Sequence, residues 1–488
     1  MRLPREQRAR LGSKVRALRR GENLNQSELA ERLGISASYL NLIENNHRPL
    51  TADLLIRLSQ LFDIELNSFA AEEGSRTQAA LYEAFSDPLF ESQDVPAAEV
   101  RALVGESPAL ARAVLCLYRS YRTLRESSEL MASRLCDGET GGGLVAHVSS
   151  EEVADLIQQH VNYFPELEAA AEGLWQSAGL AHDDLYPGLV RHLQKAYGIE
   201  VCIEKATKQK AGQILRSYDA EAKRLTLSEL LPNRSRRMQL AYQIGLLSQG
   251  DVLDRLTTSP LLTTEESKTL ARAALANYFA AAVLMPYDAF LRAAREQRYD
   301  LEVIGRRFGT GFEQVAHRLT TLRRKGAEGV PFHMIRIDVA GNISKHFSAS
   351  GIQIARFSGA CPRWNIFQAF STPGMIRIQL SRMPDNQSYF CIARTVQGDN
   401  HGFQVPPRVH VIGLGCPASR ARELVYSDGL DLSQDAAVPV GITCRLCERG
   451  DCEQRAFPSL SRSIRLDENV RGLSLYTEVR DERTRDGE

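Results

Sequence analysis

Nine cysteines are spread over the 488 residues of this chain, and three of them lie close together near its C-terminal end. Cys444, Cys447 and Cys452 are separated by two and four residues. At this spacing three thiolates can converge on one soft metal centre if a fourth ligand comes from elsewhere in the chain. Cys416 is the first candidate for that ligand and Cys361 the second, because both have small neighbours that let backbone approach a cluster.

The spacing of these cysteines leaves the identity of the metal open. A [4Fe–4S] cluster is the favoured interpretation and would give redox or gas sensitivity, whereas zinc would give a closed structural site. The third interpretation is that the thiols are free and packed in the fold. Because the sequence has no bilayer-spanning apolar run and no signal peptide, we expect a cytoplasmic protein without a membrane partner. A disulfide framework is not expected in that reducing compartment.

Two segments in the middle of the chain, residues 233–246 and 276–286, together resemble the IrrE/ImmA family of zinc peptidases. Those enzymes carry His-Glu-x-x-His on a helix, where two imidazoles one turn apart bind zinc and the glutamate activates water. Tyr242, Gln243 and Leu246 stand at these positions, and residues 270–275 lack the acidic third ligand. We therefore predict that the chain is not an enzyme.

A scaffold that keeps its cleft but loses its metal ligands is a natural place for a small-molecule pocket. Tyr242 and Gln243 are candidate ligand-binding residues, and Arg216 and Arg318 are candidate partners of an anionic ligand. The alternative is that Tyr242 and Gln243 are ordinary polar residues at the edge of the core, and that both arginines form surface ion pairs.

The N-terminal end of the chain has the pattern of a nucleic-acid-binding domain. Its first 60 residues contain eleven Lys/Arg and six Asp/Glu, a local net charge of +5 in a chain that is neutral overall. Apolar residues recur at helical spacing, Gly34 can form a tight turn between two helices, and Ser36 can cap the second helix. Residues 25–45 resemble the helix-turn-helix of the phage-repressor (XRE or Cro/CI) family, and the likeness covers residues 8–66.

In that family the second helix of the motif lies in the major groove of double-stranded DNA, while the first crosses the phosphate backbone. The resemblance predicts a groove helix over residues 36–44, with Leu40 and Ile43 facing the core. It implies DNA contacts from Ser36 at the start of the helix, from Ala37, Ser38, Asn41 and Asn45 toward the bases, and from Gln26, Tyr39 and Arg48 toward the phosphates. One such domain reads a half-site, so we expect a homodimer.

Two further patterns describe the rest of the chain. From residue 108 an apolar stripe advances in steps of three and four through Leu110, Val114, Leu117, Tyr121 and Leu124, and we interpret it as intramolecular core rather than a dimer seam. Residues 136–143 then end the helix in a glycine-rich linker. After residue 330, alternating apolar residues predict strands over 333–339, 374–380, 389–396 and 408–413.

These patterns predict a multidomain α+β fold. The expected parts are an all-α lambda-repressor-like helix-turn-helix domain (1–72), a helical connector (73–150), a degenerate zincin-like α+β ligand domain (151–325), a strand-rich C-terminal domain with the cysteine cluster (326–475) and a disordered tail (476–488).

The order of these parts, with residues 347–351 and 424–431, resembles the short-chain fatty-acyl-CoA regulator family over nearly the entire chain. The resemblance implies a transcriptional regulator of propionate and acetate metabolism whose effector is a short acyl-CoA. One alternative is an iron–sulfur redox regulator that binds no metabolite. Another is a regulatory protease, against which the missing zinc ligands argue.

Overall fold

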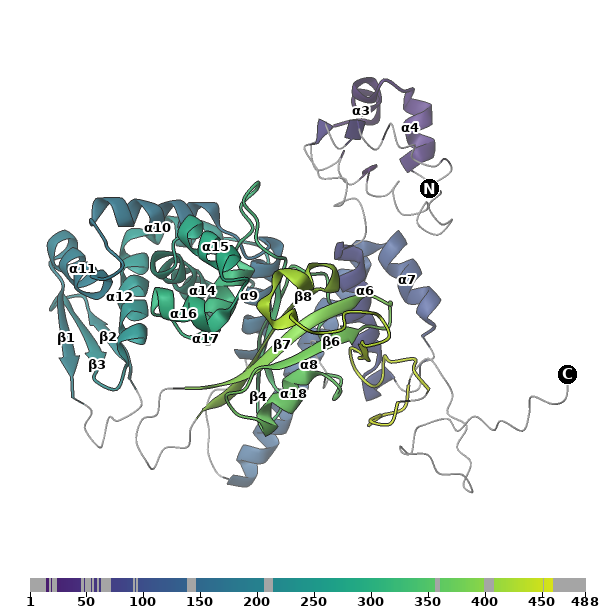
Figure 1. Cartoon of the computed structure of the whole chain (residues 1–488). Helices are drawn as coiled ribbons and strands as arrows, with labels where there is room; N and C mark the ends of the chain where they lie inside the picture. Colours follow the sequence, from purple (N-terminus) through teal and green to yellow (C-terminus); the bar gives the residue numbers. More distant parts are fainter. Residues whose placement is uncertain are drawn as a thin grey trace, which may run out of the picture. The chain divides into compact units, whose positions relative to one another are not determined.

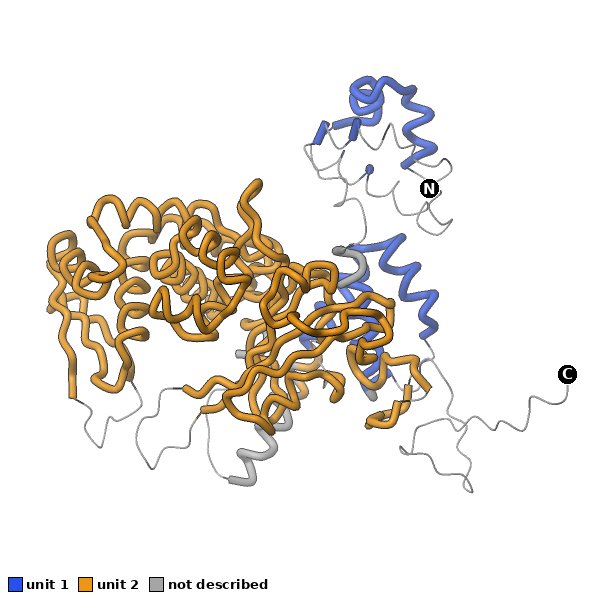
Figure 2. Tube along the Cα trace, in the orientation of Figure 1, with its two compact units in different colours: residues 1–120 blue, residues 121–488 orange. Residues whose placement is uncertain are grey.

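The computed structural model describes residues 24–44, 72–90, 95–137, 146–205, 214–355, 360–398, 408–450 and 452–459, with isolated residues at 15–16, 19, 48, 54, 57–58, 61–62 and 93. The chain divides into two compact units, residues 1–120 and residues 121–488, which have different colours in Figure 2. Helices and strands occur in the predicted order, which confirms the multidomain α+β class. The predicted tail after residue 476 lies outside the described residues.

The helix-turn-helix consists of α3 (Gln26–Leu33) and α4 (Ala37–Glu44). Asn25 and Glu28 form a capping box at the start of α3, and Gly34 ends this helix in the left-handed conformation, at φ 69°. Ser36 Oγ accepts a hydrogen bond from the backbone N–H of Tyr39 at 3.1 Å, so its predicted capping role is confirmed. The small core of this domain contains Val15, Leu29, Leu33, Leu40, Ile43, Leu54 and Leu58.

Four further elements follow: α6 (Glu72–Phe85), η2 (Pro88–Phe90), α7 (Ala97–Glu106) and α8 (Pro108–Asp137). The buried side of α8 is formed by Ala111, Leu115 and Tyr118, and the Tyr118 hydroxyl donates to Asp87 Oδ2 at 3.0 Å. Leu110 and Leu117 are 56% and 73% exposed instead. The prediction that their stripe belongs to the intramolecular core is therefore wrong for these two residues.

The middle of the chain is a helical assembly beside a small three-stranded sheet of order β1-β3-β2 (Figure 1). Its helices are α9 (Ala146–Gln159), α10 (Pro165–Ser177), α11 (Leu185–His192), α12 (Asn233–Ser248), α13 (Gly250–Thr257), α14 (Glu265–Leu284), α15 (Tyr287–Glu296), α16 (Leu301–Phe308) and α17 (Phe312–Thr320); its strands are β1 (Glu200–Glu204), β2 (Arg216–Asp219) and β3 (Arg224–Ser228). A Cβ added at Gly245 on α12 would lie 2.7 Å from the Phe279 ring on α14. Glycine thus lets the two segments that resemble the zinc peptidases pack tightly together.

The C-terminal part is a six-stranded sheet of order β5-β4-β8-β7-β6-β9. Its strands are β4 (His333–Asp338), β5 (Ile343–Ser348), β6 (Arg377–Arg382), β7 (Ser388–Gln397), β8 (Val409–Pro417) and β9 (Val438–Pro439), and α18 (Asn365–Gln368) packs against β6, β7 and β8. The four predicted strands are thereby confirmed, and β5 and β9 are additional.

The two faces of this sheet contribute to different cores. On one face Phe390, Ile412 and Leu414 belong to the same continuous core as Phe279 and Phe290 of the helical assembly. The other face carries a second core, which includes Ile335, Ile352, Cys361, Trp364, Ile366 and Val440. One hydrophobic core therefore passes across residue 325, where the sequence predicted a domain boundary.

Among the described residues, no single helix is both long and apolar enough to cross a membrane. Helices α14 and α15, which meet at 66°, reach that length and apolarity only as a bent pair. Both helices are packed in the continuous core of residues 121–488.

Candidate DNA-binding and effector sites

The exposed side of α4 carries short polar side chains. Ser36, Ser38 and Asn41 are exposed, whereas Ala37 and Tyr39 are half-buried, and Leu40 and Ile43 are buried as predicted. Arg48 is exposed beyond the end of the helix, and Asn45 lies outside the described residues. The structure thus presents most of the predicted DNA contacts on an accessible surface.

Gln26 and Asn41 are joined across the two helices of the motif. Gln26 Nε2 donates to Asn41 Oδ1 at 3.3 Å and to Glu44 Oε2 at 2.8 Å, while Arg19 Nε donates to Glu44 Oε1 at 2.7 Å. Burial alone would raise the pKa of Glu44, but the hydrogen bonds from Arg19 and Gln26 and the charges of Arg19 and Arg16 lower it below its usual value. This buried carboxylate fixes α4 against α3, so it sets the direction in which α4 presents its polar side.

The role of Glu44 and the exposure of Leu42 were not predicted from the sequence. Glu44 follows Ile43 at the end of the groove helix, where helical spacing from Leu40 places it toward the core. Leu42 is 40% exposed on α4 and provides an apolar surface suited to a thymine methyl group. A charged residue at the same helical spacing as the apolar side of a helix is the signal that would have predicted the ion pair of Glu44 with Arg19.

Three of the four predicted ligand-binding residues come together at the degenerate peptidase motif. The Arg216 guanidinium on β2 lies 4.2 Å from the centre of the Tyr242 ring and donates to Gln243 Oε1. Gln243 is buried, and burial lowers the pKa of Arg216 although Tyr242 acts in the opposite direction. A cation therefore lies against the two positions where a zinc peptidase carries its first histidine and its glutamate.

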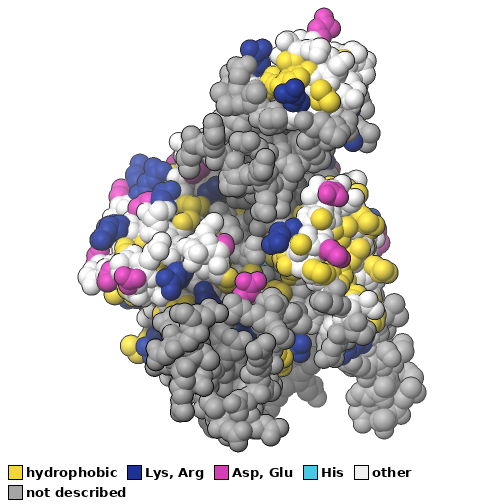
Figure 3. All heavy atoms as spheres, turned by 90° about the vertical axis from the view of Figure 1, so that its right-hand side faces the viewer, with side chains coloured by type: hydrophobic (Ala, Val, Ile, Leu, Met, Phe, Trp, Pro, Cys, Tyr) yellow, Lys and Arg dark blue, Asp and Glu magenta, His cyan; other side chains and the backbone are white. Residues whose placement is uncertain are grey.

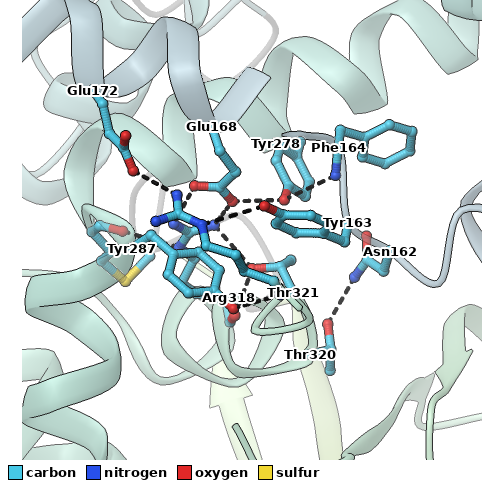
Figure 4. A network of polar contacts seen from close by, with 12 residues as sticks. Asn162, Tyr163, Phe164, Glu168, Glu172, Tyr278, Tyr287, Arg318, Thr320 and Thr321 are labelled. Atoms are coloured by element: carbon cyan, nitrogen blue, oxygen red, sulfur yellow. Dashed lines mark hydrogen bonds and ion pairs between the residues drawn. The ribbon is translucent and has the colours of Figure 1, made fainter. Parts of the chain in front are cut away.

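The fourth residue, Arg318, lies elsewhere and is already paired (Figure 4). It forms a two-pronged ion pair with Glu168 of α10, with Nη2 2.9 Å from Oε2, and its Nε donates to the Met285 carbonyl at 3.0 Å. The Tyr278 hydroxyl donates to the same carboxylate at 2.6 Å. Burial would lower the pKa of Arg318, but the charge of Glu168 raises it above its usual value. Because every group in this network is buried and satisfied, Arg318 does not face an incoming ligand.

A cleft of about 940 Å³ lies where the helical assembly meets the C-terminal sheet. Its helical wall comes from the start of α12, from α16 and from the turn of Gly309, Thr310 and Gly311 that leads into α17; its other wall comes from the ends of β7 and β8. Arg234, Arg306, Arg394 and His410 line it, together with Glu302 and Glu313. None of the four predicted ligand-binding residues is among the described residues that line this cleft.

The carboxylates of the cleft are neutralised by neighbouring cations. Glu302 pairs with Arg394 at 2.6 Å, and Glu313 pairs with Arg336 and Lys345 at 2.9 and 3.1 Å. The Nδ1 atom of His410 is buried and has no hydrogen-bond partner among the described residues. A cationic cleft with an unsatisfied polar atom is chemically suited to an anionic ligand.

The three clustered cysteines lie in a loop that is organised around one buried arginine. Arg455 donates to the carbonyl oxygens of Cys444 and Cys447 at 2.9 and 2.8 Å. Cys361 lies beside this loop, because its backbone N–H donates to the Ile442 carbonyl at 3.0 Å. Burial raises the pKa of the Cys361 thiol, and the nearby thiols of Cys444 and Cys447 raise it further.

Cys416, the first candidate for the fourth ligand, is on the wrong face of the sheet. It pairs with Phe390 in the β7–β8 ladder and packs into the core shared with the helical assembly. Cys361 belongs to the core on the opposite face, together with Trp364 and Val440. Successive side chains of a strand point to opposite faces, so the position of Cys416 on β8 excludes it from the loop. The second candidate, Cys361, lies beside the loop.

The thiols of Cys361, Cys444, Cys447 and Cys452 fit a soft metal in their chemistry, since they are half-buried or buried and arginines surround them. The distances between these side chains are larger than those in a site that holds a metal ion. In the described part of the chain, no three His, Cys, Asp or Glu side chains lie close enough to one another to hold a metal ion.

Three family models match successive parts of the chain. A helix-turn-helix model matches residues 15–69, an IrrE N-terminal-like domain matches residues 194–320, and the C-terminal model of the short-chain fatty acyl coenzyme A regulators matches residues 321–476. The last two meet at residue 320, at the end of α17. The resemblances stated from the sequence are therefore confirmed.

Curated relatives match over almost the whole chain. The HTH-type transcriptional regulator RamB of Mycobacterium tuberculosis is 39% identical over 96% of this chain and 98% of its own. The propionyl-CoA carboxylase regulator of Cereibacter sphaeroides is 40% identical over 95% of this chain and 98% of its own. A solved Mycobacterium tuberculosis transcriptional regulator is 38% identical, with a TM-score of 0.65, over 68% of this chain and 99% of that one.

Proposed function

The chain belongs to the short-chain fatty acyl coenzyme A regulators, a family whose curated members are transcriptional regulators, and we propose that a short-chain acyl-CoA sets its affinity for operator DNA. The observation that carries the proposal is the cationic cleft between the helical assembly and the C-terminal sheet. Genes of propionate and acetate metabolism are the proposed targets, since the Cereibacter relative is named as a propionyl-CoA carboxylase regulator.

The cleft has the properties that an acyl-CoA requires. CoA carries several phosphate charges and an adenine, so its site needs arginines and a flat stacking surface, and 300–1,000 Å³ is about the usual volume of a ligand pocket. Arg306 supplies a cation, whereas Arg394 neutralises Glu302 and lies with its guanidinium 5.2 Å from the centre of the Phe312 ring.

We expect Arg306→Ala and His410→Ala to weaken propionyl-CoA binding by about tenfold each, because a hydrogen bond to a charged group contributes about 1.5–3 kcal/mol. Calorimetric titration with acetyl-, propionyl- and longer acyl-CoA measures this. Arg307→Ala is the matched control, because Arg307 neighbours Arg306 but pairs with Glu296 and is not among the cleft residues.

The Arg216 cluster is the alternative location of the effector. Binding that survives Arg306→Ala and His410→Ala but is lost in Arg216→Ala or Tyr242→Ala would move the pocket to the degenerate peptidase motif. Absence of binding to any acyl-CoA, with a metal centre intact, would make redox sensing by an iron–sulfur regulator the better account.

Operator binding by a symmetric dimer is the second part of the proposal, because one helix-turn-helix reads only a half-site. Asn41→Ala should reduce discrimination at one base pair by about 1–3 kcal/mol. Arg48→Ala should weaken specific and random DNA alike and reduce the salt dependence. Fluorescence anisotropy with operator and random duplexes at several salt concentrations separates the two effects. Equal losses on both duplexes for Asn41→Ala would contradict its assignment to a base.

We also propose that Cys361, Cys444, Cys447 and Cys452 hold a [4Fe–4S] cluster, with zinc as the alternative. The donor set supports this, since cysteine thiolates prefer soft metals and Cys361 lies beside the loop that carries the other three. When bound, the metal would tie residue 361 to the loop that follows β9. The chain is also proposed to lack peptidase activity, because the residues at 242, 243 and 246 are neither zinc ligands nor a general base.

A further inference from the structure

Helix α8 has two apolar sides, and among the described residues one is buried whereas the other is half-buried at Val114 and Tyr121 and exposed at Leu110 and Leu117. Ala111, Leu115 and Tyr118 are buried, and Tyr118 packs on Phe90 with ring centres 6.2 Å apart. Leu110, Val114, Leu117 and Tyr121 form the other side, the outer stripe, since they are spaced by four, three and four residues. Leu110 and Leu117 are among the most exposed large apolar side chains of the chain. Figure 3 shows hydrophobic side chains exposed on the face of the chain where α7 and the start of α8 lie.

We propose that the outer stripe of α8 is where two copies of this chain dimerise. A two-fold interface brings identical surfaces together, so it must be free of unpaired like charges. The outer stripe contains no charged residue, and helical spacing places Arg112 and Arg119 on the opposite side of the helix. Ala109, Ala113 and Cys116 line one edge of the stripe and are exposed, so a second helix can approach closely there.

The size of the stripe indicates how strong this dimer is. Residues 110–121 extend over roughly 18 Å of helix. A single stripe of this length covers less than the approximately 800 Å² that each partner contributes to a standard interface. We therefore infer a dimer that dissociates in the micromolar range on its own and that is strengthened when its two helix-turn-helix domains occupy adjacent half-sites. Only the strengthening of the dimer on DNA rests on the proposed function; the dimer interface itself does not.

Leu117→Asp in the full chain should raise the dimer dissociation constant by about 100-fold or more, because the two-fold axis brings the two introduced carboxylates together. Sedimentation velocity over a range of concentrations measures this. Val339→Asp is the matched control: Val339 is 80% exposed in the turn between β4 and β5, so this variant should dimerise like the wild type. Propionyl-CoA binding should be unchanged in both, which separates failure of the interface from failure of the effector proposal.

Cross-linking provides a second test that does not require a destabilising change. In a Cys116→Ser background, Leu117→Cys should form a covalent dimer on mild oxidation, whereas Val339→Cys should not. A wild-type chain that is monomeric at every concentration, a Leu117→Asp chain that still dimerises, or equal cross-linking of both cysteines would each overturn the proposal. The first result would mean that the stripe does not join two copies of this chain, and the second would mean that the dimer forms through another surface.

Discussion

Replacing Glu168 with alanine should lower the free energy of unfolding by about 3–5 kcal/mol, because it leaves the Arg318 cation buried without its counter-charge. Glu168 and Arg318 are 150 residues apart in the sequence and join α10 to α17 in the interior of the helical assembly. The Tyr278 hydroxyl would lose its carboxylate acceptor as well, whereas the Thr321 hydroxyl accepts from Arg318 and would keep that partner. Urea denaturation followed by Trp175 fluorescence measures the change, since Trp175 lies on α10 and donates to the Val283 carbonyl.

A matched control lies one turn further along the same helix. Glu172 pairs with Arg324 at 2.6 Å, but both side chains are partly exposed, so Glu172→Ala should cost less than about 1 kcal/mol. The double variant Glu168→Leu with Arg318→Met should recover much of the stability lost in Glu168→Ala, because it removes both buried charges. Equal losses of unfolding free energy in Glu168→Ala and Glu172→Ala would show that the buried ion pair contributes no more to stability than the partly exposed one.

Cys447→Ser should remove the bound iron or zinc from protein purified without oxygen and destabilise the C-terminal sheet region. Binding of a structural metal contributes about 10–16 kcal/mol in small zinc domains, so even a fraction of that energy would appear as a large drop in melting temperature. Elemental analysis and absorbance near 400 nm measure the metal, and circular dichroism measures the melting. DNA binding by the helix-turn-helix should survive.

Two further cysteine variants test the choice of the fourth ligand. Cys361→Ser should lose the metal as Cys447→Ser does, whereas Cys416→Ser should keep it, because Cys416 faces the core on the other side of the sheet. Cys116→Ser, at an exposed position on α8, is the control for loss of a thiol as such. If native protein contains neither iron nor zinc, the cysteines are free packed thiols and the cluster proposal is wrong.

The sequence predicted those parts of the fold whose signals are local. The left-handed Gly34 and the Ser36 cap both lie within the helix-turn-helix segment that they define. The alternation of apolar residues in β4 and β8 likewise reveals a strand without knowledge of its neighbours.

The predictions that failed depend on contacts distant in sequence. Spacing alone does not say which side of β8 faces the cysteine loop, so it could not place Cys361 beside the loop and Cys416 on the other face of the sheet. Arg318 had the appearance of a free cation because its partner Glu168 lies 150 residues away. Apolar residues on two adjacent sides of α8 make overlapping stripes, and only packing on Phe90 decides which side is interior.

The core shared by the helical assembly and the C-terminal sheet also constrains how such a protein evolves. Phe279 and Phe290 on one side of residue 325 lie in the same core as Phe390 and Leu414 on the other. A chimera of two relatives joined at this boundary would bring together core residues from different proteins. Each fragment alone would expose its share of the core. Cutting the chain at this boundary should therefore destabilise both pieces, whereas the helix-turn-helix has a core of its own.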